Sequence, residues 1–169
     1  MNKLRSIIEP DVALAEERYP IVLQAIRDYT KLIDESGDES LDAYTKLTTI
    51  LHELTGKDMA AYNLDEWWEE EGDEVLAFRI SLPYPLKVPD FTKEELTEIV
   101  TRIKNPELPR GNEENITETF AIYLDQYYHK LLSLNFENYD IKQFQRNKDK
   151  SGKYYEYSVN EIVEMLWNK

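Results

Sequence analysis

The sequence predicts an α+β fold in a single domain over residues 1–169, with about five to six helices packed on a small antiparallel sheet. Apolar residues recur at helical spacing through most of the chain, two capping boxes mark helix starts, and short runs near 76–82 and 142–157 resemble strands. With 169 residues, 41% of them hydrophobic, the chain is long enough to build one core. No repeat and no linker-like segment divides it.

The first third of the chain is predicted to form a helical hairpin. Apolar side chains at helical spacing predict a helix over 11–35, and the pattern leaves open whether this helix is continuous or restarts at Pro20. A turn at 36–40 precedes a second helix, which is expected to end at Gly56. Because the connection is short, we expect the two helices to pack antiparallel.

A short helix and a strand are expected next. Asn63 can cap a helix that carries the two adjacent tryptophans and ends at Gly72. Leu76, Phe78 and Ile80 then alternate with smaller or polar residues, which predicts a strand over 76–82. Prolines at 83, 85 and 89 keep the following chain extended.

Helices and a hairpin are predicted for the second half. A capping box at 92–95 begins one helix, a longer helix is expected over 113–133, and a second capping box at 158–161 begins the last one. Strands over 142–146 and 153–157 are expected to form a hairpin. This hairpin is basic in an otherwise acidic chain, and edge lysines that prevent strand pairing between molecules explain it more simply than self-association or an intramolecular contact does. Its cations are Lys142, Arg146, Lys148, Lys150 and Lys153.

The net charge of −14 restricts the class of partner. Phosphate recognition relies on clustered Lys and Arg, so we expect no direct nucleic-acid ligand. An acidic surface favours solubility and fast association with basic proteins. The chain has no cysteine, no apolar stretch long enough to cross a membrane and no apolar N-terminal leader, so we expect a cytoplasmic protein without disulfides.

The usual catalytic motifs are missing. The five glycines are isolated, so no phosphate-binding loop is expected. His52-Glu53 resembles the start of a zinc-protease helix, but Gly56 stands where the second histidine is needed. His129 and Asp125 are one helical turn apart, an arrangement that is usually structural. We therefore assign no catalytic residue, no metal ligand and no cofactor, although a carboxylate-only Mg²⁺ or Ca²⁺ site in 65–74 stays open.

The segment 65–74 is the best candidate for a binding site. Seven carboxylates in ten residues repel one another and so do not stabilise a fold, and two adjacent Trp side chains add apolar area beside them. Neighbouring residues on a helix point about 100° apart, so at least one of these rings is expected to be exposed. The candidate partner-binding residues are Asp65, Glu66, Trp67, Trp68, Glu69, Glu70, Glu71, Asp73 and Glu74.

Three functional hypotheses follow. The first is a non-catalytic binding or neutralising protein, of the immunity-protein or inhibitor type, that docks a basic protein partner. The second is a nucleic-acid mimic that occupies the groove of a DNA- or RNA-binding enzyme. The third, least favoured, is a small hydrolase or transferase that uses Glu and His129 in a Tyr-lined pocket. The sequence indicates neither the partner's identity nor the oligomeric state.

Overall fold

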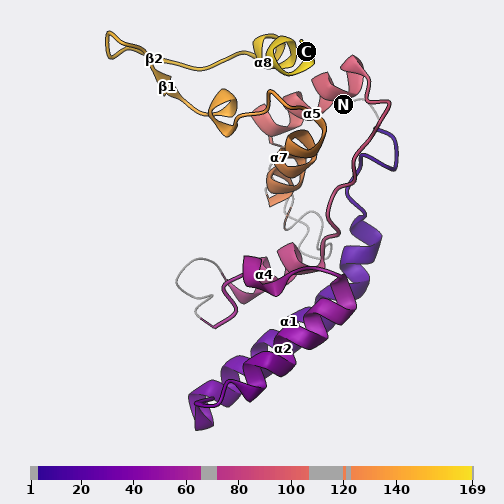
Figure 1. Ribbon diagram of the computed structural model, residues 1–169, viewed down its shortest axis with the longest axis vertical. Helices are drawn as coiled ribbons and strands as arrows, with labels where there is room; N and C mark the ends of the chain where they lie inside the picture. The colour runs from indigo at the N-terminus through magenta and orange to yellow at the C-terminus, as the bar shows by residue number, and fades with distance from the viewer. Residues whose placement is uncertain (1–3, 66–71, 107–119, 121–122, 169) are drawn as a thin grey trace. The chain divides into compact units, whose positions relative to one another are not determined.

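The computed structural model describes residues 4–65, 72–106, 120 and 123–168, and these are mostly helical (Figure 1). They form six α-helices and one small antiparallel sheet of two strands. The chain divides into two compact units, which we call the α1–α4 unit (residues 11–83) and the α5–α8 unit (residues 1–10 and 84–169). The single domain expected over residues 1–169 stays a prediction. Among the described residues, no helix is long and apolar enough to cross a membrane.

The α1–α4 unit is built on two long helices. Helix α1 runs over Val12–Ser36 and α2 over Asp42–Thr55, and the two lie side by side (Figure 1). Helix α1 is continuous through Pro20, which answers the question that the sequence left open. The core of the unit joins one face of each helix to α4, Asp73–Ser81. Its buried residues are Val22, Ile26, Tyr29, Leu47, Leu51, Met59, Leu64, Leu76, Ala77 and Ile80.

Local hydrogen bonds explain where these helices begin and end. The Asp11 carboxylate accepts a hydrogen bond from the Leu14 backbone N–H at 3.1 Å and so caps α1. Gly56 ends α2 as predicted, with φ of 70° and its N–H donating to the His52 carbonyl at 2.7 Å. A short 3₁₀ helix, η1, follows at Met59–Ala61.

The strand predicted over 76–82 is wrong, because this segment is helix α4. Leu76, Phe78, Ile80 and Leu82 alternate in sequence, but Ala77 and Ser81 between them are also buried. A helix buried on several sides has no polar face to reveal its period, so its apolar residues can mimic a strand pattern. The predicted short helix between Asn63 and Gly72 lies mostly outside the described residues.

The α5–α8 unit contains the two capping boxes that the sequence predicted. Thr92 and Glu95 begin α5 (Lys93–Lys104), and Ser158 begins α8 (Val159–Trp167). Of the helix predicted over 113–133, the described part is α7, Leu124–Asn135. Helix α5 packs against both α7 and α8. Buried residues of this unit include Leu96, Ile99, Val100, Leu131, Leu132, Ile162, Val163 and Leu166.

A hairpin is present near 142–157, but it is shorter than expected. Strand β1 (Asn147–Lys148) pairs antiparallel with β2 (Tyr154–Tyr155). The first predicted strand, over 142–146, is wrong, because Ile141–Phe144 forms the 3₁₀ helix η3. Asp140 begins η3 with a capping box of its own, an i to i+3 pattern that the strand interpretation overlooked.

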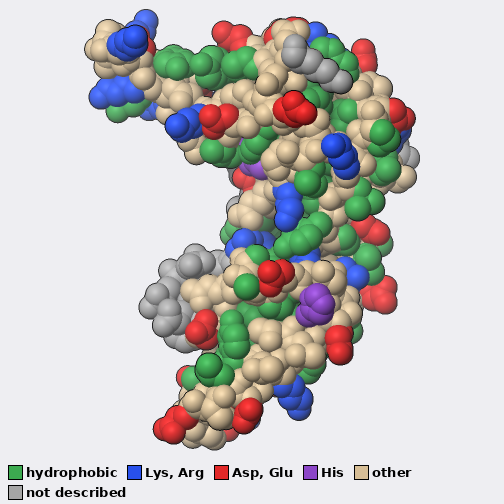
Figure 2. Space-filling model, in the orientation of Figure 1, with side chains coloured by type: hydrophobic (Ala, Val, Ile, Leu, Met, Phe, Trp, Pro, Cys, Tyr) green, Lys and Arg blue, Asp and Glu red, His purple; other side chains and the backbone are tan. Residues whose placement is uncertain are grey.

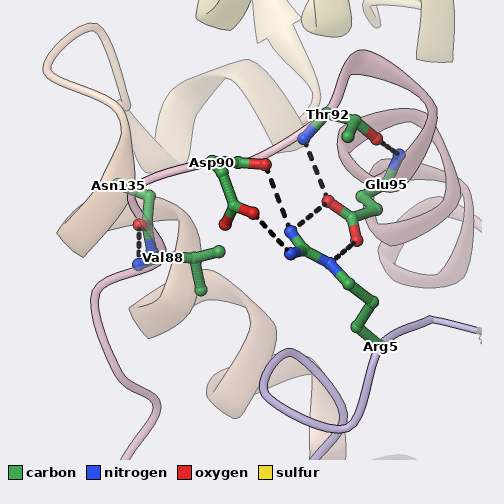
Figure 3. A network of polar contacts seen from close by, with 6 residues as sticks. All are labelled: Arg5, Val88, Asp90, Thr92, Glu95 and Asn135. Carbon is green, nitrogen blue, oxygen red and sulfur yellow. Dashed lines mark hydrogen bonds and ion pairs between the residues drawn. The ribbon is translucent and has the colours of Figure 1, made fainter.

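The N-terminal segment is tied to α5 by two arginine networks. In the first, shown in Figure 3, Arg5 donates to the Asp90 carboxylate and to the Glu95 carboxylate, each at 2.9 Å. The Arg5 guanidinium holds the pKa of Glu95 below its usual range. A second bond in the figure joins the side chain of Asn135 on α7 to the Val88 N–H at 2.7 Å. Together these bonds fix the extended segment that precedes α5.

The second network is more deeply buried. Arg102 on α5 donates to both carboxylate oxygens of Glu9, at 2.9 and 3.1 Å, and to Glu98 at 2.9 Å. It also donates to the Tyr128 hydroxyl at 2.8 Å. Burial first, and then the Glu9 charge, raises the pKa of Tyr128 to about 12. One guanidinium therefore joins the N-terminal segment, α5 and α7 of the unit.

Candidate functional site

The negative charge of the chain is concentrated in the α1–α4 unit. Residues 11–83 contain eighteen acidic and six basic residues, a net charge of −12. The rest of the chain contains sixteen acidic and fourteen basic residues, a net charge of only −2. A cationic partner that meets this chain is therefore attracted by the α1–α4 unit far more than by the α5–α8 unit.

The predicted binding segment 65–74 is described only at its ends. Asp65 is exposed, whereas Asp73 and Glu74 lie in the first turn of α4 and bind Arg27 at 2.6 and 3.3 Å. These two acids therefore have an intramolecular cation as partner. They also lie at the N-terminus of α4, where the positive end of the helix dipole stabilises negative charge. The other predicted residues lie outside the described part of the chain: Glu66, Trp67, Trp68, Glu69, Glu70 and Glu71.

Lys57 is directed into the unit rather than toward solvent. It is only 2% exposed, and its ammonium group donates to the Arg79 carbonyl at 2.7 Å and to the Tyr62 hydroxyl at 3.1 Å. A buried ammonium group needs such acceptors, because an unsatisfied one is costly. Arg27 and Lys57 are thus bound within the unit, and Lys31 pairs with Glu35 at 3.9 Å, while most of the described acids of the unit face solvent.

A hollow of about 450 Å³ lies beside the end of α2, and we call it the α2–η1 hollow. Gly56 ends α2 and turns the chain back, so that η1 lies against the side of the helix that has just ended. One wall comes from α2 and the other from residues 58–60. The lining residues are Tyr44, Thr48, Thr49, His52, Glu53, Asp58, Met59 and Ala60.

The charged groups of the hollow are all negative. Glu53 and Asp58 are both exposed carboxylates. Asp58 also caps η1 by accepting the Ala60 N–H at 2.9 Å, which fixes its position. The Tyr44 ring and the buried Met59 side chain supply apolar surface between them. An apolar wall with carboxylates at its rim fits a cation carried on an aliphatic stem.

His52 contributes an acceptor to the same hollow. Its Nδ1 lies 2.8 Å from the Lys57 carbonyl oxygen. Because a carbonyl can only accept, Nδ1 carries the proton and donates this bond. In the neutral ring Nε2 is then left with a lone pair. His52 is exposed and can therefore accept a hydrogen bond from an incoming donor.

The negative charge of Asp65, at the start of the predicted binding segment, acts on a residue that lines the hollow. Tyr44 and Tyr29 meet edge to face, with ring centroids 5.8 Å apart. Burial raises the pKa of Tyr44, and the negative charge of Asp65 raises it further. The same two influences, together with Asp38, raise the pKa of Tyr29. Asp65 is therefore close enough to Tyr44 to add to the negative potential of the hollow.

His129 lies in an aromatic cluster of the α5–α8 unit. It is half-buried, its Nδ1 lies 3.0 Å from the Tyr139 hydroxyl, and its ring meets Phe144 edge to face at 4.8 Å. Burial lowers the pKa of His129, and the Asp125 charge opposes this. Within the described residues, no group of three or more His, Asp or Glu side chains could hold a metal ion.

The sequence pattern alone does not indicate the hollow, although it contains two of its residues in a recognisable motif. His52-Glu53 resembles only the start of a zinc-protease helix, and Asp58 belongs to no motif. A signal was present: Glu53 and Asp58 flank Gly56, the predicted end of α2. Where a helix ends and the chain reverses, acids on both sides of the stop can approach each other.

Comparisons with protein-family models, with curated proteins and with solved structures found no match to this chain.

Proposed function

We propose that this chain is a non-catalytic binding protein that docks a basic protein partner on its α1–α4 unit, as an immunity protein or an inhibitor covers its target. The observation that carries the proposal is the net charge of −12 on this unit together with a hollow whose charged groups are all acidic. Carboxylates draw the partner in, and a protruding Lys or Arg side chain of the partner enters the hollow.

The hollow suits the two parts of such a side chain. The aliphatic stem packs against Tyr44 and Met59, and the cation lies near Glu53 and Asp58. Both carboxylates are exposed, so each ion pair contributes only about 0.2–1 kcal/mol. The two together change affinity by roughly 2- to 30-fold. The hollow therefore selects the partner's cation, while other contacts must supply most of the affinity.

The segment 65–74 is the proposed source of those contacts. Asp73 and Glu74 already bind Arg27, so we assign the electrostatic part of the interaction to Asp65 and to the glutamates between them. Trp67 and Trp68 are the residue type that most often anchors protein interfaces. That these two tryptophans anchor the partner is part of the proposal.

Affinity capture from the organism that encodes this chain tests the proposal. Four immobilised forms are compared: the wild type, a Glu53→Gln/Asp58→Asn variant, a variant with the acids of 65–74 changed to Gln or Asn, and a Glu94→Gln/Glu137→Gln control. Asn still caps η1, so the Asp58 change preserves the local fold. We expect a basic protein that the wild type and the control retain, that both site variants retain less, and that salt releases.

The control removes as much charge as the hollow variant, but from exposed positions of the α5–α8 unit. If all four forms retain the same proteins equally at low salt, the acidic surface does not select a partner and the proposal is wrong. If the retained protein is a nucleic-acid enzyme and DNA displaces it, the chain acts as a nucleic-acid mimic instead.

A further inference from the structure

The β1–β2 hairpin is a second charged surface, opposite in sign to the hollow. We call residues 146–155 the basic hairpin, and their net charge is +3. Figure 2 shows Lys and Arg side chains gathered over it. None of its four cations forms an ion pair with a described residue. They are Arg146, Lys148, Lys150 and Lys153.

The acids near this hairpin are engaged locally. Asp149 builds the turn, because its carboxylate accepts the Ser151 N–H at 2.8 Å and the Lys153 N–H at 2.9 Å. Hydrogen bonds from Ser151 and Lys153 keep the pKa of Asp149 low. Glu156, just beyond β2, binds Lys104 on α5 at 3.3 Å. The hairpin therefore presents positive charge to the surroundings.

Aromatic rings accompany the cations. The Arg146 guanidinium lies 4.5 Å from the Tyr154 ring centroid, and the Lys148 ammonium lies 5.3 Å from it. Tyr154 is 55% exposed and Tyr155 is 41% exposed. Exposed Arg and Tyr side chains held together in this way are typical of protein interfaces.

We propose that the basic hairpin of one copy docks on the α1–α4 unit of a second copy and places its cations at the α2–η1 hollow. This inference rests on the proposed function, because the same hollow receives the cations in both cases. The argument is charge complementarity: a surface of net charge +3 and a unit of net charge −12 occur in one chain. A basic partner then competes with the hairpin of the second copy.

A nucleic acid fits the hairpin less well. The chain as a whole carries −14, which repels a polyanion at low salt. Arg146 and Lys148 also lie near the Tyr154 ring, so a base that stacked on this ring would compete with both cations for it. The contact between copies is heterologous, because hairpin meets hollow, so it forms rings or open chains of molecules.

Sedimentation velocity on the full chain tests the inference at low and high salt. We expect the wild type to exceed its 20.0 kDa monomer mass as concentration rises at low salt, and to return to it at high salt. A Lys148→Gln/Lys150→Gln variant should associate about 2- to 30-fold more weakly. A Lys31→Gln/Lys87→Gln control has the same net charge as this variant but an intact hairpin, and it should associate like the wild type.

A mixing experiment identifies the two surfaces. The hairpin variant has an intact hollow, and the Glu53→Gln/Asp58→Asn variant has an intact hairpin. Each should self-associate weakly, but together they should form a one-to-one complex, which stops there because each partner has one intact surface. A wild type that stays monomeric at low salt, or a mixture that forms no complex, overturns the inference.

A last arm adds a single-stranded DNA oligomer. If DNA binds the wild type and not the hairpin variant, the hairpin serves a nucleic acid and the inference is wrong. If the wild type stays monomeric yet a basic partner still binds the hollow, the inference fails while the proposed function stands. If neither a second copy nor a basic partner binds, both fail.

Discussion

Replacing Arg102 with leucine is expected to destabilise the α5–α8 unit strongly. This guanidinium binds Glu9, Glu98 and the Tyr128 hydroxyl at once. Leucine keeps part of the apolar stem but removes the guanidinium that binds both the Glu9 and the Glu98 carboxylates. Removing one partner of a buried ion pair costs more than the pair itself contributes, because the remaining charge stays in a poorly solvated place.

The exposed fractions of these side chains set the size of the effect. They are 17% for Arg102, 9% for Glu98 and 33% for Glu9. Breaking a fully buried pair costs about 3–5 kcal/mol, and water reaching Glu9 reduces this. We therefore expect a loss of about 3 kcal/mol in the free energy of unfolding at pH 7. For a chain of this length that lowers Tm by roughly 6–12 °C.

Urea unfolding followed by far-UV circular dichroism measures this loss. A Lys104→Gln variant is the matched control, because Lys104 lies on the same helix but binds Glu156, which is 54% exposed. That pair should contribute less than about 1 kcal/mol. An equal loss of stability in both variants would refute the reasoning.

Three further predictions concern single residues. Wild-type stability should fall between pH 10 and 12, because an unfolded tyrosine ionises near pH 10 whereas burial raises the pKa of Tyr128 to about 12. In urea unfolding across that range, a Tyr128→Phe variant should lack about 2–3 kcal/mol of this decline. Gly56→Ala should cost about 1 kcal/mol in thermal unfolding, because φ is 70° there although the added methyl group meets no atom. Thr92→Ala should cost about 1 kcal/mol in urea unfolding through loss of the α5 cap, and Thr92→Ser should restore most of it.

Helix boundaries were the most predictable part of the fold. The boxes at Thr92 and Ser158 and the stop at Gly56 are confirmed, because each depends on residues within one helical turn. The hairpin near 142–157 is confirmed in a shorter form. Its first half failed because the Asp140 cap competed with strand propensity and formed η3.

Helix α4 depended on tertiary structure and could not be predicted locally, and the only local sign of the hollow was that Glu53 and Asp58 flank the helix end at Gly56. Leu76, Phe78 and Ile80 fit a strand in sequence, but the space around α4 buries Ala77 and Ser81 too. Which acidic side chains form ion pairs within the fold also depends on tertiary structure. Nothing near Asp73 in sequence indicates that Arg27, on another helix, neutralises it.

Titration of the full chain with a short oligolysine peptide, followed by two-dimensional amide NMR at low salt, tests the central claim most directly. We expect the largest shifts at Glu53, Asp58 and the neighbouring backbone of α2 and η1, and we expect weaker binding by the Glu53→Gln/Asp58→Asn variant. The Glu94→Gln/Glu137→Gln control should bind like the wild type. Shifts spread evenly over the acidic residues, with equal affinity for all three forms, would contradict the claim that the hollow receives a cation.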